Sequence, residues 1–280
     1  MSKLQRVDAA VDKFLAKASK KNKPLEAFRE TESFKQFEQK MRDALQSQAK
    51  WVSKNLKDID VLSEDDVSEK RLKDELGAWI YRNMPRTSTY ISEQKVYTYL
   101  HNAFVFSVEA QLKRLGLIVK ADSVDFKLTN EYYIAGLKNQ ANYLLNKSKI
   151  DDTTTKSLVN IIADRRMGKD TIDEIAREIS SDFEGISEGR AFVIANTETN
   201  QAMSSGQQAY FKENGVTTKS WVPAGGSTCD ECEGNADDGP IGIDESYSSG
   251  DMHPPAHPSC ECYEDGGEID LDAIDIWDGS

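Results

Sequence analysis

The chain has 280 residues, of which 38% are hydrophobic, and its mean hydropathy is −0.61. This length allows one or two domains with a real core. No stretch approaches the roughly 18 consecutive apolar residues of a membrane span, and a start charged at Lys3, Arg6 and Asp8 is unlike a signal peptide. We therefore expect no membrane partner and cysteines that stay reduced, as in the cytosol.

Charge is divided unevenly along the chain. Residues 1–57 hold 14 Lys and Arg against 7 Asp and Glu, whereas residues 220–280 hold 16 Asp and Glu and no Lys or Arg. An acidic end repels phosphate, so the C-terminal region is a poor general binder of nucleic acid. The basic N-terminal region is a candidate for weak DNA contact, and a solvated helix face is the alternative explanation of its lysines.

The first 150 residues have the apolar spacing of helices. The run Ser63–Asp66 has the form of an N-cap with acids in the first turn. A short strand is expected at 117–119. The expected helices lie around 4–15 and over about 24–56, 63–83, 92–115 and 129–147.

From residue 151 onward the pattern predicts three helices, a strand and a cysteine-rich loop. Thr171 and Glu174 fit a capping box, and Asn214–Gly215 fits a helix end because glycine readily takes the left-handed conformation there. The strand is rich in β-branched residues and carries Trp221. These helices are expected over about 155–166, 171–183 and 187–214, and the strand over 216–222.

Together the elements predict a mainly α protein with a small α+β domain towards its C-terminal end. We expect a variable helical region over 1–150, the small domain over 151–263, and an acidic flexible tail over 264–280. The tail interleaves acidic residues with isoleucine, leucine and tryptophan, so it also suits a peptide that orders on a partner.

All four cysteines of the chain lie within one short region. Cys229 and Cys232 are separated by two residues, so both thiols can bind one tetrahedral metal from a tight turn. After 24 residues the chain returns with His257, Cys260 and Cys262, and both side chains of an extended Cys-x-Cys share a face. The spacing predicts a structural Zn²⁺ site with four of these five residues as ligands.

Two alternatives compete with zinc, namely a disulfide pair and four unrelated cysteines. Reduced thiols favour the metal over the disulfide, and the two close pairs argue against unrelated residues. His253 is a weaker ligand candidate because Pro254 and Pro255 stiffen the backbone between it and the other residues.

Several motifs follow one another between residues 172 and 262. A helical run at 172–176 precedes Arg-Ala-Phe-Val-Ile-Ala-Asn-Thr-Glu-Thr-Asn at 190–200. Then come Gly-Val at 215–216, Lys-Ser-Trp at 219–221, Thr-Cys-Asp-Glu-Cys at 228–232 and Pro-Pro-Ala-His-Pro-Ser-Cys-Glu-Cys at 254–262. In this order they resemble the phage Mu protein F-like domain of phage minor head (head morphogenesis) proteins, over about residues 155–263. The chain departs from the family at Asn196 and Glu261, where arginine is usual.

The resemblance implies a structural protein of the virion, placed inside the capsid near the portal vertex in one or a few copies. It implies the portal protein as partner, with the major capsid or scaffolding protein as further candidates. The implied role is to assist capsid assembly in the host cytoplasm, and packaging or ejection of the genome. Neither enzymatic activity nor a small-molecule substrate is implied.

A metal-dependent nuclease or hydrolase is the alternative from another class. Catalytic zinc keeps an open position for water, whereas a thiolate-rich site closed by four protein ligands suits a structural role. A nuclease also needs a phosphate clamp, and the cysteine region has no Lys or Arg. We therefore interpret His101, Thr197 and Glu198 as packing or hydrogen-bonding residues and not as catalysts.

Overall fold

The computed structural model of the chain describes residues 24–64, 66–114, 131–146, 150–225 and 228–267. The helices are α2 (Pro24–Arg29), α3 (Glu32–Asn55), α4 (Glu69–Asn83), α5 (Glu93–Arg114), α7 (Glu131–Asn146), α8 (Ile150–Met167), α9 (Ile172–Glu213) and α10 (Asp230–Asp237). Short 3₁₀ turns occupy Leu56–Asp58, Asp60–Ser63 and Thr87–Thr89, and the strands are β1 (Thr218–Val222), β2 (Ile241–Gly242) and β3 (Tyr263–Gly266). The expected fold class, mainly α with a small α+β part, is confirmed.

The chain divides into two compact units that alternate along the sequence. Unit 1 comprises Met1–Phe34, Tyr99–Ile134 and Asn196–Ser280, and unit 2 comprises Lys35–Thr98 and Ala135–Ala195. Several long helices, α9 among them, contribute one stretch to each unit. The predicted metal ligands all belong to unit 1.

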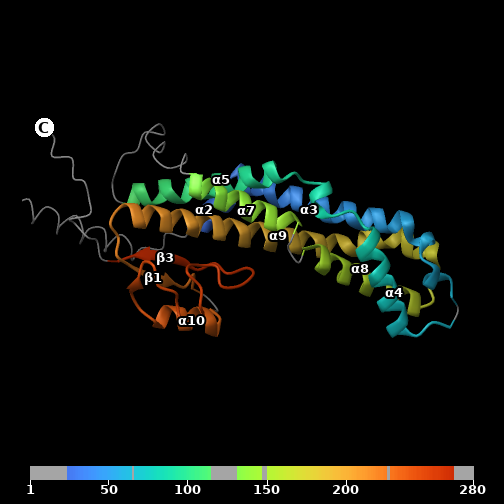
Figure 1. Cartoon of the computed structure of the whole chain (residues 1–280). Coiled ribbons are helices and arrows are strands. Elements are labelled where there is room, and N and C mark those ends of the chain that lie inside the picture. Colours follow the sequence, from blue (N-terminus) through green and yellow to red (C-terminus); the bar gives the residue numbers. More distant parts are fainter. Residues whose placement is uncertain (1–23, 65, 115–130, 147–149, 226–227, 268–280) are drawn as a thin grey trace, which may run out of the picture. The chain divides into compact units, whose positions relative to one another are not determined.

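Unit 2 is a helical body in which α4 and α8 lie side by side (Figure 1). Its core includes a buried polar cluster, in which Gln48 Nε2 and Thr87 Oγ1 donate to Asp151 Oδ1 at 2.8 and 2.6 Å. Trp51 stacks on Trp79 with ring centroids 5.7 Å apart. Because buried carboxylates are costly unless hydrogen-bonded, this cluster fixes the start of α8 against α3 within the unit.

Helix ends follow local side-chain chemistry. Thr31 separates α2 from α3, since its hydroxyl donates to Phe28 O at 2.7 Å and accepts from Phe34 N at 3.3 Å. The capping box of Thr171 and Glu174 is confirmed, with Glu174 Oε2 accepting from Thr171 N at 2.8 Å. The expected cap at Ser63 is wrong: Ser63 ends a 3₁₀ turn, and Ser68 caps α4 by accepting from Arg71 N at 3.4 Å.

The two helices expected over 171–183 and 187–214 are one continuous helix, α9. Ser187 does not begin a helix but is buried inside it, and its hydroxyl donates to Glu184 O at 2.8 Å. Phe183, Ser187, Ala191 and Ala195 are all buried, which keeps one face of α9 against the core at four-residue spacing. The end at Asn214 is as expected, with Gly215 at a φ of 69°.

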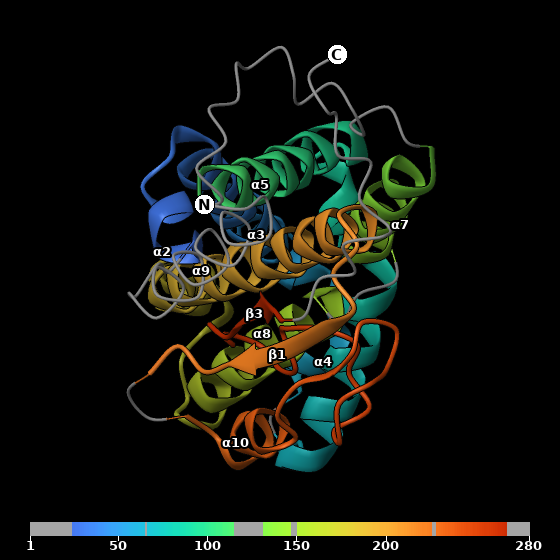
Figure 2. The same ribbon diagram turned by 90° about the vertical axis from the view of Figure 1, so that its left-hand side faces the viewer.

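Unit 1 contains a three-stranded antiparallel sheet in the order β2-β1-β3. Lys219 pairs with Ile241 on one side of β1, and Trp221 pairs with Glu264 on the other. The sheet lies between the C-terminal part of α9 and the short helix α10 (Figures 1 and 2). Strand β3 corrects the expected tail, because residues 264–266 belong to the sheet.

Some expectations fall on residues outside the described ranges. These are the helix around 4–15, the strand at 117–119, the first 23 residues of the basic N-terminal region and the tail from 268 onward. Among the residues that the structure does describe, no helix is long and apolar enough to cross a membrane.

Candidate metal centre

The centre is built from two segments of unit 1. Cys229 and Cys232 lie at the start of α10, where Cys229 is the N-cap and its sulfur accepts from Cys232 N at 3.5 Å. His257, Cys260 and Cys262 come from the loop that leads into β3. The hydrogen bond from Cys232 N lowers the pKa of Cys229. A helix N-terminus also favours a thiolate.

The structure brings all five predicted ligands together. Cys229, Cys232 and His257 form one triplet and Cys232, Cys260 and Cys262 a second, each with its ligand atoms within 4.8 Å of one another. His257 Nε2 lies 3.2 Å from Cys229 Sγ and 3.3 Å from Cys232 Sγ, and Cys232 Sγ lies 3.7 Å from Cys260 Sγ. Ligand atoms of a tetrahedral zinc site are about 3.5–3.8 Å apart, and the observed separations lie within a few tenths of an ångström of that range, so these residues fit the ion.

The four cysteines are free thiols in the structure, without a disulfide. Burial raises the pKa of Cys232 to about 12, and the hydrogen bond with Cys262 together with burial raises the pKa of Cys260. Without a cation these two thiols therefore stay protonated at neutral pH. A bound metal reverses the preference, because its charge deprotonates a coordinating thiol.

The two histidines near the cysteines have different roles. His257 Nδ1 lies 2.9 Å from Pro258 O and must donate to that carbonyl, so the lone pair of Nε2 faces Cys229 and Cys232. The contact with Pro258 also raises the pKa of His257. His253 Nδ1 likewise lies 2.7 Å from Pro254 O, but its Nε2 is 3.4 Å from Gln201 Nε2 and outside both triplets.

A row of amide side chains on α9 holds the cysteine segment. Asn200 Nδ2 donates to the carbonyls of Cys260 at 2.8 Å and Cys262 at 3.1 Å, and Gln207 Nε2 donates to Glu264 O at 3.3 Å. Thr197 Oγ1 accepts from Ser259 N at 3.0 Å. These contacts satisfy backbone groups of the segment that enters β3, which lies at the edge of the sheet.

Three of the candidate ligands, Cys232, Cys260 and Cys262, sit in an apolar cluster with a charged pair beside it. Trp221 and Tyr247 pack on three of the cysteines, with ring centroids 5.0 Å apart and planes at 81°. Lys219 and Glu264 are fully buried at 3.8 Å from each other, and Lys219 Nζ donates to Met252 O. Burial raises the pKa of Glu264 to about 7 and lowers the pKa of Lys219.

Sequence reasoning missed the amide row and the buried lysine. Asn200, Gln201, Gln207 and Gln208 are spaced as two adjacent pairs seven residues apart, which places them on one helix face. That spacing could have indicated a row of amide side chains along one face of the helix. The burial of Lys219 had no comparable signal, since a single lysine in a strand is normally exposed.

The other residues considered as catalysts are spread over the unit. His101 lies on α5, where burial lowers its pKa, and is absent from both metal triplets. Thr197 is engaged with Ser259 as described above. Comparison with protein-family models, with curated proteins and with solved structures finds no match to this chain.

Proposed function

We propose that the chain is a phage minor head protein whose cysteine and histidine centre binds Zn²⁺ as a structural clamp. The observation that carries the proposal is the contact of Asn200 with the carbonyls of Cys260 and Cys262. It joins two of the three motifs that together make the resemblance specific, the helix that contains Thr197 and Glu198 and the closing His-Pro-x-Cys-x-Cys. Those motifs thus serve one folded module.

The chemistry of the centre supports a structural and not a catalytic ion. Three thiolates with one imidazole, or four thiolates, fill a tetrahedral shell and leave no position for water. The module is small and rich in loops, so the apolar surface it buries is limited and a metal would contribute much of its folding free energy. Zinc would be held by Cys229, Cys232 and His257 with Cys260 or Cys262, and would tie α10 to β3.

The assembly role follows from the resemblance. We propose that the chain occupies the virion near the portal vertex, with the portal protein as its partner and the major capsid or scaffolding protein as further candidates. It would assist head assembly in the host cytoplasm, and genome packaging or ejection. The acidic surface of the cysteine module, which has no Lys or Arg over residues 220–280, favours protein over nucleic acid as its partner.

Native mass spectrometry of the reduced full-length chain tests the clamp. We expect one zinc ion per chain, and a zinc-free protein with four freely reactive thiols would contradict it. Quantitative mass spectrometry of purified virions of the phage that encodes the chain tests the role. We expect a few copies per particle against the major capsid protein, and its absence from both virions and assembling heads would refute the assignment.

A further inference from the structure

An arginine joins helix α2 to the segment that carries Cys260 and Cys262. Arg29, the last residue of α2, donates from Nε to Asn196 Oδ1 at 2.8 Å and from Nη2 to the carboxylate of Glu261. The side chain of Arg29 is 18% exposed and that of Glu261 is 38% exposed. A charge-assisted contact that is partly shielded from water is stronger than a surface ion pair.

Glu261 lies between two of the candidate ligands. Successive side chains of an extended segment point to opposite faces, so Cys260 and Cys262 share one face and Glu261 takes the other. The burial pattern agrees, because Cys260 and Cys262 are buried at 2% and 5% exposure while Glu261 is partly exposed. One short segment thus presents its sulfurs to the metal and its carboxylate to α2.

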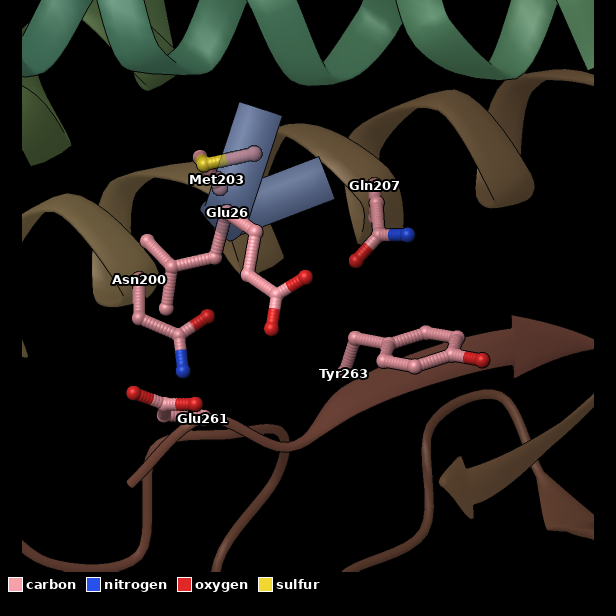
Figure 3. A pocket seen from close by; sticks show the side chains of 7 residues that line it. Glu26, Asn200, Met203, Gln207, Glu261 and Tyr263 are labelled. Atoms are coloured by element: carbon pink, nitrogen blue, oxygen red, sulfur yellow. The ribbon is translucent and has the colours of Figure 1, made fainter. Parts of the chain in front are cut away.

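The rest of α2 packs closely on the same region of unit 1. Leu25 and Phe28 are buried, and the ring of Phe28 meets that of Phe106 edge to face at 5.2 Å. Between α2, α9 and β3 only a cavity of about 10 Å³ remains, room for about one water molecule (Figure 3). Its lining includes Leu25 and Glu26 of α2, and Asn200 and Glu261 from the residues that hold the centre.

A helix of six residues is not stable alone, so α2 depends on these tertiary contacts. One of them is made by Glu261, whose position depends on its two cysteine neighbours. When a metal fixes those sulfurs, it also fixes the backbone between them. The carboxylate of Glu261 is then held where it contacts the guanidinium of Arg29.

We propose that metal binding at the centre and docking of α2 stabilise each other, with Arg29 and Glu261 as the pair that couples them. The inference rests on the proposed zinc clamp. Because coupling between two equilibria is reciprocal, a metal that secures α2 must itself bind more tightly when α2 is docked. The segment that precedes α2, residues 1–23, carries seven Lys and Arg against two Asp.

Hydrogen exchange of the full-length chain with and without zinc tests the coupling. We expect the amides of α2 to exchange at least about fivefold more slowly in the zinc-loaded protein, which native mass spectrometry identifies beforehand. Arg29→Ala should abolish that difference and weaken zinc binding about fivefold in competition with a chromophoric chelator. Arg42→Ala is the matched control, since Arg42 is also a partly buried arginine with carboxylate partners but belongs to unit 2.

A double-mutant cycle distinguishes the effect of the Arg29–Glu261 contact on zinc binding from a general loss of structure. Glu261→Gln keeps the shape of the side chain, and Arg29→Ala combined with Glu261→Gln should weaken zinc binding no more than Arg29→Ala alone. Additive losses would overturn the pair as the coupling element. Zinc bound at one per chain with unchanged exchange in α2 would overturn the inference and leave the clamp standing, whereas absence of zinc binding would refute both.

Discussion

Asn200 on α9 donates one amide hydrogen to Cys260 O at 2.8 Å and lies 3.1 Å from Cys262 O, so a helix far along the chain holds both carbonyls of the Cys-x-Cys segment. Asn200 is 3% exposed, which means that water cannot replace it. The backbone of the candidate metal-binding segment is thereby held in place by the protein itself. Supporting residues of this kind set ligand geometry as much as the ligands do.

Asn200→Ala should therefore lower the free energy of unfolding by more than the loss of a single hydrogen bond usually does. It leaves two buried carbonyls without a donor, and we expect the free energy of unfolding to fall by about 1–3 kcal/mol. Urea denaturation followed by tryptophan fluorescence measures this. Asn102→Ala is the control, because the exposed Asn102 amide donates to Ser33 Oγ at 3.0 Å and its loss should cost less than about 0.5 kcal/mol. Equal costs for the two variants would contradict the supporting role of Asn200.

Cys232 is shared by both triplets of ligand atoms, so Cys232→Ser should remove zinc more completely than any other single change. The variant should lose the bound metal and show faster proteolysis within residues 216–262, with the helices of unit 2 still protected. His253→Gln should keep its zinc, since the ring of His253 already contacts Pro254 and Gln201. Metal content by mass spectrometry and matched cleavage maps provide the comparison. A zinc-free His253→Gln would show that His253 is a ligand after all.

Lys219→Met should destabilise unit 1 because it leaves the buried carboxylate of Glu264 without a cation. Glu264 would be buried without its cationic partner, and breaking a buried pair costs about 3–5 kcal/mol at a pH above 7, where the carboxyl is ionised. Lys219→Met combined with Glu264→Gln removes both charges and should recover most of that loss. Chemical denaturation of the three proteins measures the difference. If the double variant is no more stable than the single one, the cost comes from packing and not from the unpaired carboxylate.

The sequence allows most of the helical framework to be predicted, because long segments with regular apolar spacing can bury a face only as helices. It fails at boundaries that depend on tertiary burial. Ser187 has the local features of an N-cap, yet the buried row from Phe183 to Ala195 keeps the helix continuous. Strand β3 was expected to be tail, because its acidic residues resemble those that follow. Pairing with β1 and the burial of Glu264 are what make it a strand.

The candidate metal ligands could be predicted from the sequence, but the residues that hold their backbone in place could not. Two cysteine pairs and a histidine at this spacing indicate a tetrahedral site from the sequence alone. The contacts that hold the segment come from Asn200, Thr197 and Arg29, which are distant in the sequence and carry no signature of metal binding. Only the fold shows that they meet at the segment, because each contact joins elements separated by tens of residues.

The pH dependence of stability should include a contribution from His101. Burial lowers its pKa in the folded protein below the ordinary value of 6.5, so below that value the unfolded chain binds more protons than the folded one. Stability is then fully present above about pH 6.5 and is lost as the pH falls towards the folded pKa. Thermal unfolding midpoints between pH 5 and 7.5 test this, with His101→Gln expected to show a shallower decline. An identical pH profile in the variant would contradict the contribution.

Two glycines in α9 should respond to alanine in opposite directions. At Gly206 a Cβ atom would lie 2.9 Å from Phe104 O and 3.3 Å from Phe104 Cδ2, so α5 approaches the helix too closely for any side chain. Gly206→Ala must push backbone apart, and we expect a loss of about 1–3 kcal/mol. At Gly185 no atom lies within 4 Å of the added Cβ, and alanine is the better helix former. Gly185→Ala should therefore stabilise the chain by about 0.5–1 kcal/mol.

Gly206→Ala and Gly185→Ala are the same substitution in the same helix, so each variant serves as the control for the other. Helix propensity favours alanine at both positions, so any difference in sign measures the contact with Phe104 alone. Thermal and chemical denaturation of the two variants give that difference directly. A stabilising Gly206→Ala would mean that α5 and α9 are not in backbone contact at Phe104. Gly206 lies within the amide row, between Asn200 and Gln207, so displacing α9 there should also weaken zinc binding at the centre. Gly185→Ala should leave zinc affinity unchanged.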